Sequence, residues 1–154
     1  MPQRQSQPRS VNVLISAADW AWPQAVRDIF QPRGINALIA NSPSDVINLV
    51  ASSKIHLAIL DAVLDNLSGM NTLKMARQHD PLLPCILLAR EPGRRLLAEA
   101  LALDVFSVLA KPVDLDLLAR QLDRLFHKYY ASDVFSVHPP SSSLGIDLRS
   151  LDHN

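Results

Sequence analysis

Residues 56–73 read HLAILDAVLDNLSGMNTL, and this stretch decides the fold class. It opens with residues 56–60, an apolar run whose length and composition are typical of a β-strand covered on both faces. The run ends at Asp61, and a loop containing Gly69 leads to residues 70–76, where apolar side chains recur at helical spacing. The stretch therefore predicts one strand, one loop and one helix in succession.

The same unit of strand followed by helix is repeated along residues 11–130. The other predicted strands and helices, in chain order, are residues 11–16, 22–31, 35–40, 42–53, 85–89, 92–103, 105–110 and 114–130. Short links between the units favour right-handed crossovers, and hence parallel strands with helices on both faces. We expect an α/β fold with a doubly wound, five-stranded parallel sheet of flavodoxin-like (βα)5 topology.

The two ends of the chain differ from this domain. Residues 1–10 are polar and lack periodicity, so we expect a disordered lead-in. Residues 131–154 contain consecutive prolines and a serine run, which is typical of a tail or linker. Apolar residues in this tail could instead dock on some other surface; they are Leu144, Ile146, Leu148 and Leu151.

Composition limits the function classes. The 154 residues are 48% hydrophobic, which suits one domain with a core. Lysine plus arginine equal aspartate plus glutamate at 15 each, so nucleic-acid binding by this chain alone is disfavoured. No apolar run is long enough to cross a bilayer and the first residues lack a secretory signal, so we expect a cytoplasmic protein without membrane contact. Cys85, the only cysteine, excludes an intrachain disulfide and is expected to be a buried, inert thiol.

Ligand and reaction sites of open parallel sheets lie at the carboxyl ends of the strands. In this chain, few residues follow the predicted strands directly. They are Ala17, Ala18 and Asp19 after the first strand, Asp61 after the third, Ala89 and Arg90 after the fourth, and Lys111 after the fifth. We expect these residues to line one pocket.

Two segments resemble the receiver family of two-component signalling. They are residues 56–73, quoted above, and residues 110–122, which read AKPVDLDLLARQL. Asp61 falls on the family's phosphoacceptor aspartate, and Lys111 falls on its phosphate-pairing lysine. The resemblance covers about residues 11–128 and implies the five-unit fold expected above.

The resemblance also implies a phosphorylation chemistry. A carboxylate that attacks a phosphoryl donor needs a divalent cation to offset the charge of the incoming group, and Mg²⁺ prefers further carboxylate oxygens beside it. Receivers supply these oxygens from an acidic pair after the first strand, while the lysine pairs with the phosphoryl oxygens. A serine or threonine after the fourth strand contacts the phosphoryl group, and its movement is linked to an aromatic side chain on the fifth strand.

This sequence departs from the family pattern at three places. Ala17 and Ala18 stand where the acidic pair is expected, and neither side chain can bind a metal. Ala89 stands at the hydroxyl position. Val108 stands at the aromatic switch position, with Phe106 one strand repeat earlier. The nucleophile and the lysine are retained, whereas the cation site and the relay are missing.

Asp61 can be interpreted in two ways. A fixed ion pair with Lys111 would hold the strand ends together, and we favour this interpretation. Alternatively, Asp19 swings towards Asp61, and the two carboxylates form a weak Mg²⁺ site that supports slow phosphorylation. Arg90 adds a further hypothesis, because its guanidinium either reaches the Asp61 carboxylate and locks the pocket or belongs to a solvated loop.

We therefore predict a degenerate receiver, or pseudo-receiver, that is not an enzyme, needs no cofactor and acts in phosphorelay signal transduction through protein contacts. The alternative is a working phosphoprotein that accepts a phosphoryl group on Asp61 from a histidine kinase. A third class, an unrelated flavodoxin-like domain that binds a small molecule, lacks a supporting motif, because the chain has only 4 glycines and no glycine-rich phosphate loop. The resemblance also implies homodimers formed through residues 92–130.

Overall fold

A computed structural model describes residues 11–16, 22–64, 66–130 and 146–147, and the structural statements below concern these residues. Their centre is a sheet in which five parallel strands have the order β2-β1-β3-β6-β7, and an antiparallel strand, β8, pairs with β7 at the edge. The strands are β1 (Val11–Ser16), β2 (Ile35–Ala40), β3 (Leu57–Asp61), β6 (Cys85–Ala89), β7 (Ser107–Ala110) and β8 (Ile146–Asp147). The expected five-stranded parallel sheet is confirmed, and β8 extends it.

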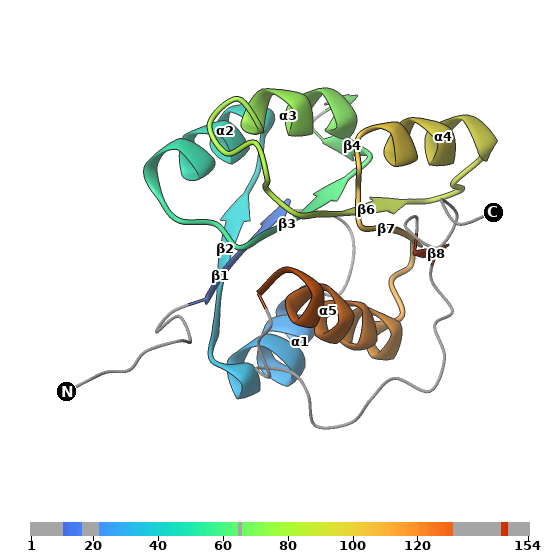
Figure 1. The fold of residues 1–154 in the computed structure, drawn as a ribbon. Coiled ribbons are helices and arrows are strands. Elements are labelled where there is room, and N and C mark those ends of the chain that lie inside the picture. The colour runs from blue at the N-terminus through green and yellow to red at the C-terminus, as the bar shows by residue number, and fades with distance from the viewer. Residues whose placement is uncertain (1–10, 17–21, 65, 131–145, 148–154) are drawn as a thin grey trace.

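Helices cover both faces of this sheet (Figure 1). They are α1 (Trp22–Ala25), α2 (Pro43–Ser52), α3 (Gly69–Ala76), α4 (Arg94–Ala102) and α5 (Leu115–Tyr130). The first helix continues into a π-helical segment, Val26–Phe30, and a 3₁₀ turn, Gln31–Arg33. Helices α1 and α5 lie on one face, and α2, α3 and α4 lie on the other. Right-handed crossovers produce this doubly wound arrangement.

Local sequence signals set several helix boundaries. Ser42 caps α2, since its Oγ accepts a hydrogen bond from the backbone N–H of Asp45 at 3.2 Å. Asp114 caps α5 in the same way, and its Oδ1 accepts from the N–H of Leu117 at 3.2 Å. Gly34 adopts a left-handed conformation, with φ of 72°, and ends the helical segment that follows α1. These boundaries agree with the predicted ones.

The sheet has a separate apolar core on each face. Every residue of β3 and β6 is buried, as predicted for strands covered on both sides. Alternate residues of β3 contribute to the two cores: Ile59 packs in the core with α5, and Leu60 packs in the core with α3. Cys85 lies within the second core, where burial raises the pKa of its thiol to about 12. The predicted burial of this thiol is confirmed, and its inertness stays a prediction. The buried side of α5 contains the predicted residues Leu117, Leu118, Leu122, Leu125 and Phe126.

Strand β7 begins at Ser107, two residues later than the sequence indicated. Phe106 therefore lies outside the alternation of the strand. Its ring packs against the ring of Tyr129 in α5, with 6.1 Å between the ring centroids. Val108 instead belongs to the core on the opposite face. The two side chains lie on different faces of the sheet, so Phe106 does not occupy the space of the residue at the switch position.

Two short elements were not predicted. Strands β4 (Val63–Leu64) and β5 (Leu67–Ser68) form an antiparallel hairpin in the loop after β3. Strand β8 comes from the predicted tail, and it pairs with Ser107 and Val108 of β7. The rest of residues 131–154, like the lead-in 1–10, lies outside the described part of the chain.

His56 is buried at the amino end of β3. Its Nδ1 accepts a hydrogen bond from the backbone N–H of Asn12 at 3.1 Å, and its carbonyl oxygen accepts from the hydroxyl of Tyr130 at 2.6 Å. The imidazole also packs edge-on against the Tyr130 ring. Burial, and secondarily the charge of Lys54, lowers the pKa of His56 from its ordinary 6.5. Folding therefore favours the neutral ring over the charged one.

Acid is expected to destabilise the fold through His56. The unfolded chain takes up this proton near pH 6.5, whereas the folded chain takes it up only at lower pH. The contribution of neutral His56 to the unfolding free energy is therefore complete above pH 6.5. It is lost as the pH falls from there through the lowered pKa of His56 in the folded state. We expect His56→Asn, whose amide oxygen can accept the same hydrogen bond, to flatten the pH dependence of the unfolding free energy between about pH 7 and 5.

Urea denaturation at several pH values measures this dependence. His127→Asn is the matched control, because His127 has an exposed side chain and its loss should leave the wild-type dependence in place. Equal slopes for wild type and His56→Asn would contradict the assignment.

Candidate functional site

Asp61 ends β3 at the carboxyl edge of the parallel sheet, between β1 and β6. Its backbone N–H donates to the Oγ of Ser16, the last residue of β1, at 2.8 Å. Ser16 is fully buried, so this bond fixes the end of β3 against the end of β1. Ser16 was not among the predicted site residues, although a polar residue at the end of the apolar run 11–15 is a signal for it.

The Asp61 carboxylate forms an ion pair with Lys111. The Nζ of Lys111 donates to Oδ2, and the side chains of Lys111 and Asp61 are only 10% and 8% exposed. The other carboxylate oxygen, Oδ1, accepts from the backbone N–H of Val63 at 3.0 Å. Both oxygens are therefore engaged by donors of the chain itself, and the charge of the buried carboxylate is balanced by one lysine.

Gly69 closes the loop that follows Asp61. Its N–H donates to the carbonyl oxygen of Ala62 at 2.8 Å, so the first residue of α3 lies directly against the end of β3. A Cβ atom at Gly69 would overlap the carbonyl oxygen of Asp61 and would lie 3.2 Å from the Cα of Ala62. Only glycine allows this approach, because the obstructing atoms belong to the backbone.

The residues at the ends of β6 and β7 adjoin this pair. Ala89 ends β6 and is 5% exposed, and its carbonyl oxygen accepts the backbone N–H of Lys111 at 2.8 Å. Arg90 follows with an exposed side chain. Within the described residues, the hydrogen bonds of the Asp61 carboxylate involve Lys111 and Val63. The role of Arg90 as a lock on this carboxylate stays a prediction.

The remaining predicted site residues are Ala17, Ala18, Asp19 and Val108. Ala17, Ala18 and Asp19 lie outside the described residues, so their place beside Asp61 stays a prediction. Val108 is described, and it is a fully buried core residue of β7.

Among the described residues, the oxygen donors around Asp61 do not make up the octahedron that Mg²⁺ requires. Within the part of the chain that the structure describes, no group of three or more histidine, cysteine, aspartate or glutamate side chains could hold a metal. Asp61 contributes a carboxylate whose two oxygens already have partners. The alanine side chains at positions 17 and 18 carry no oxygen at all.

A family model described as the response regulator receiver domain matches residues 13–123, which is most of the chain. The chain belongs to the response regulator receiver domain family. This confirms the resemblance seen in the sequence, and it means that the chain is a receiver domain of two-component signalling. Receiver domains as a family interact with histidine kinases and with other proteins of these systems.

Curated relatives of this receiver domain are distant. The transcriptional regulatory protein ZraR of Escherichia coli (strain K12) is 21% identical over 141 residues, which are 92% of this chain and 32% of ZraR. The response regulator RR06 of Streptococcus pneumoniae serotype 2 is 24% identical over 121 residues, which are 78% of this chain and 55% of RR06. The chain thus spans only about a third to a half of these relatives.

Solved receiver structures share the fold. The signal receiver domain of an HD domain-containing protein from Pseudomonas fluorescens Pf-5 superimposes with a TM-score of 0.70 at 23% identity, covering 80% of this chain and 100% of that domain. A receiver protein from Pseudomonas putida gives a TM-score of 0.66 at 22% identity, covering 77% of this chain and 98% of its own. In the described residues of this receiver domain, no helix has the length and apolar character of a membrane span.

The close approach at Gly69 predicts a large effect of one methyl group. Gly69→Ala must push α3 away from the end of β3, so we expect the unfolding free energy to fall by about 2–3 kcal/mol. Gly93→Ala is the matched control, because a Cβ at Gly93 meets no heavy atom within 4 Å. Its effect should stay within about 0.5 kcal/mol. Chemical denaturation measures both, and equal losses would contradict the steric account.

The ion pair predicts non-additive mutations. Lys111→Met leaves the Asp61 carboxylate buried without its counter-charge, and we expect it to cost about 3 kcal/mol of unfolding free energy. The double variant Asp61→Asn, Lys111→Met removes both charges and should lose at least about 1 kcal/mol less than Lys111→Met alone. Lys128→Met, at an exposed position of α5, is the control. A Lys111→Met variant as stable as wild type would refute the structural role of the pair.

Proposed function

We propose that this receiver domain is a degenerate one that acts in signal transduction through protein contacts, with impaired Mg²⁺-dependent phosphorylation. The observation that carries the proposal is the state of the Asp61 carboxylate, whose two oxygens are held by Lys111 and by the N–H of Val63. A carboxylate in this arrangement is a structural partner of the lysine. Both of its oxygens already have hydrogen-bond partners without a metal or a phosphoryl group.

Charge supports the same proposal. Transfer of a phosphoryl group to an aspartate brings two negative groups together, and a bound divalent cation normally offsets their repulsion. Lys111 supplies one positive charge, which is already balanced by Asp61 itself. With alanine at positions 17 and 18, the chain offers no acidic pair that would hold a cation beside Asp61. We therefore expect phosphorylation of Asp61 to be slow or absent.

This chain also lacks the two side chains that relay the signal in the family pattern, the hydroxyl and the aromatic ring. Ala89, at the hydroxyl position, has a methyl side chain that cannot hydrogen-bond to a phosphoryl oxygen. Val108, at the switch position, is 1% exposed and packs in the core, where it has no ring to move between buried and exposed positions. Even a phosphorylated Asp61 would therefore lack the family's route to a conformational change.

The second candidate function is a working phospho-receiver, in which Asp61 accepts a phosphoryl group from a histidine kinase. The retained contact between Asp61 and Lys111 favours it, since the lysine stands where it could pair with a phosphoryl group. Under both proposals the domain is a binding module without an enzymatic reaction of its own. Its partners are proteins, including a second copy of the chain through residues 92–130.

Beryllofluoride, a mimic of the phosphoryl group, separates the two candidates. For the wild-type chain, we expect beryllofluoride with Mg²⁺ to leave the fluorescence of the two tryptophans, Trp20 and Trp22, unchanged, with no saturable Mg²⁺ binding below about 10 mM. The variant Ala17→Asp, Ala18→Asp restores the acidic pair and should gain a saturable response to both. Adding Asp61→Asn to that variant should remove the beryllofluoride response again.

One result would overturn the proposal of a degenerate receiver. It is a saturable, Mg²⁺-dependent response of the wild-type chain to beryllofluoride that Asp61→Asn abolishes. Mass spectrometry of the chain after incubation with acetyl phosphate and Mg²⁺ gives an independent answer, because an acyl phosphate on Asp61 adds a defined mass that Asp61→Asn cannot carry.

A further inference from the structure

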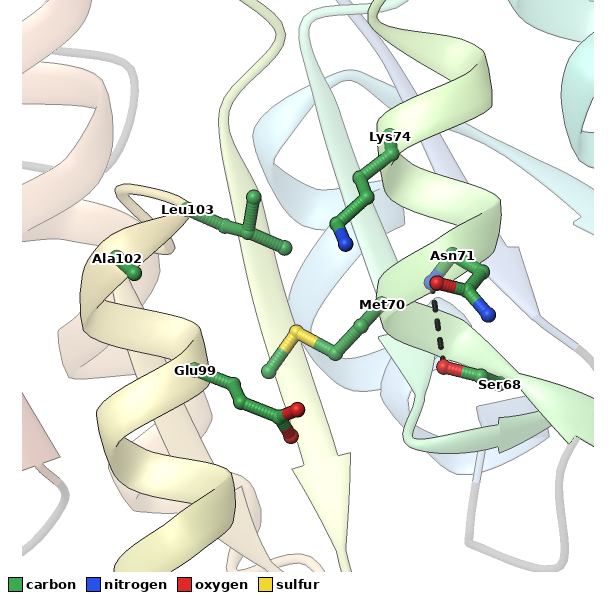
Figure 2. A pocket seen from close by; sticks show the side chains of 7 residues that line it. All are labelled: Ser68, Met70, Asn71, Lys74, Glu99, Ala102 and Leu103. Atoms are coloured by element: carbon green, nitrogen blue, oxygen red, sulfur yellow. Dashed lines mark hydrogen bonds between the residues drawn. The ribbon is translucent and has the colours of Figure 1, made fainter.

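Helices α3 and α4 leave a groove of 270 Å³ between them (Figure 2). One wall comes from the first turns of α3 and the residue before it, and the other comes from the last turn of α4 and the residue after it. Neither Asp61 nor Lys111 belongs to its lining. The groove is therefore separate from the site at the strand ends, and nothing in the proposed function uses it.

The floor of the groove is apolar. Met70 is 6% exposed and belongs to the core under α3, and the half-buried Leu103 packs against the same core. Figure 2 shows the thioether of Met70 extending from α3 into the space between the helices, with Leu103 reaching towards α3 from the other side. Such a floor can cover a short hydrocarbon stem, and methionine adapts its shape to what it contacts.

The walls carry opposite charges. Lys74 extends from α3 and Glu99 from α4, and both side chains point into the space between the helices, with Met70 between their charged ends (Figure 2). Both residues are exposed. Within the described residues, neither forms a hydrogen bond or an ion pair through its side chain. The groove thus presents one ammonium and one carboxylate without protein partners, on either side of an apolar surface.

Hydrogen bonds link the two walls at one end of the groove and cap α3 at the other. At one end, Arg77 follows α3, and its guanidinium donates to the carbonyl oxygen of Leu83 at 3.1 and 3.0 Å and to the carbonyl oxygen of Leu103. This connects the end of α3 to the end of α4. At the other end, the Oγ of Ser68 accepts from the N–H of Asn71 at 3.2 Å and caps α3. The link through Arg77 reduces the conformational entropy that the two walls can lose when a ligand binds.

We propose that this groove binds an ω-amino acid, a small dipolar molecule with a carboxylate and an ammonium at opposite ends of a short apolar stem. The ligand carboxylate pairs with Lys74, its ammonium pairs with Glu99, and its methylene groups lie on Met70 and Leu103. The volume of 270 Å³ is below that of pockets for drug-sized ligands, which begin at about 300 Å³. Small size and two opposite charges together define the ligand class.

Three probes of similar length test the dipolar requirement. We expect 6-aminohexanoate to bind the full chain saturably with a dissociation constant on the order of 1 mM, measured by NMR, with shift changes in α3 and α4. Hexanoate and hexylamine each lack one charge and should bind at least about tenfold more weakly. Absence of saturable binding by 6-aminohexanoate overturns the proposal, and so does binding of hexylamine or hexanoate with equal affinity.

Charge exchange tests the two residues. Lys74→Glu and Glu99→Lys each place like charges on both walls, and each should weaken 6-aminohexanoate binding by about tenfold or more. The double variant restores opposite charges in reversed positions, so we expect it to recover the affinity with the ligand turned round. Lys128→Glu on α5 is the matched control for a charge reversal at an exposed lysine.

Thermal unfolding of each variant shows whether the fold is intact before binding is compared. Single variants that bind as well as wild type, or an intact double variant that binds no better than the single ones, would overturn the proposal. These outcomes can be distinguished from a failure of the proposed function, because neither Asp61 nor Lys111 lines the groove.

Discussion

Strand β3 has no side that faces solvent. All five of its residues, Leu57–Asp61, are buried, and the strand pairs with β1 on one side and β6 on the other. A strand of this kind requires an apolar layer on each face, which the helices supply in two groups. It also ends in a carboxylate that must find its hydrogen bonds and its counter-charge inside the protein. Lys111 and the backbone N–H of Val63 meet that requirement at the carboxyl edge of the sheet.

The same arrangement changes what the aspartate can do. In the family pattern, the aspartate and the lysine are parts of a larger set that includes an acidic pair and a hydroxyl group. Without those groups, the attraction between Asp61 and Lys111 is no longer in competition with a cation. Under the proposed function, the chemistry of the site is that of a buried ion pair, which links the end of β3 to the residue after β7 only while both partners are present.

The loop after Asp61 connects the site to the surface of the domain. The N–H of Val63 binds the Asp61 carboxylate, the hairpin of β4 and β5 follows, and Gly69 returns the chain to the end of β3. Helix α3 starts at that contact and forms one wall of the groove that contains Lys74 and Glu99. The position of this wall therefore depends on a single glycine that packs against the backbone of the site residue.

The sequence by itself determined the order of strands and helices, the parallel sheet, the two-sided burial of β3 and the meeting of Asp61 with Lys111. The elements and their burial follow from local patterns such as apolar runs and caps, and the meeting of Asp61 with Lys111 follows from the shared edge of parallel strands together with the family resemblance. The start of β7, the hairpin, the pairing of β8 and the role of Ser16 were decided only by tertiary structure. The start of β7, the pairing of β8 and the role of Ser16 depend on which backbone groups find partners in distant segments, and the hairpin is too short to carry a strand pattern of its own. The groove between α3 and α4 belongs to the same class, because Lys74 and Glu99 lie 25 positions apart and the packing of two helices alone brings them to one opening.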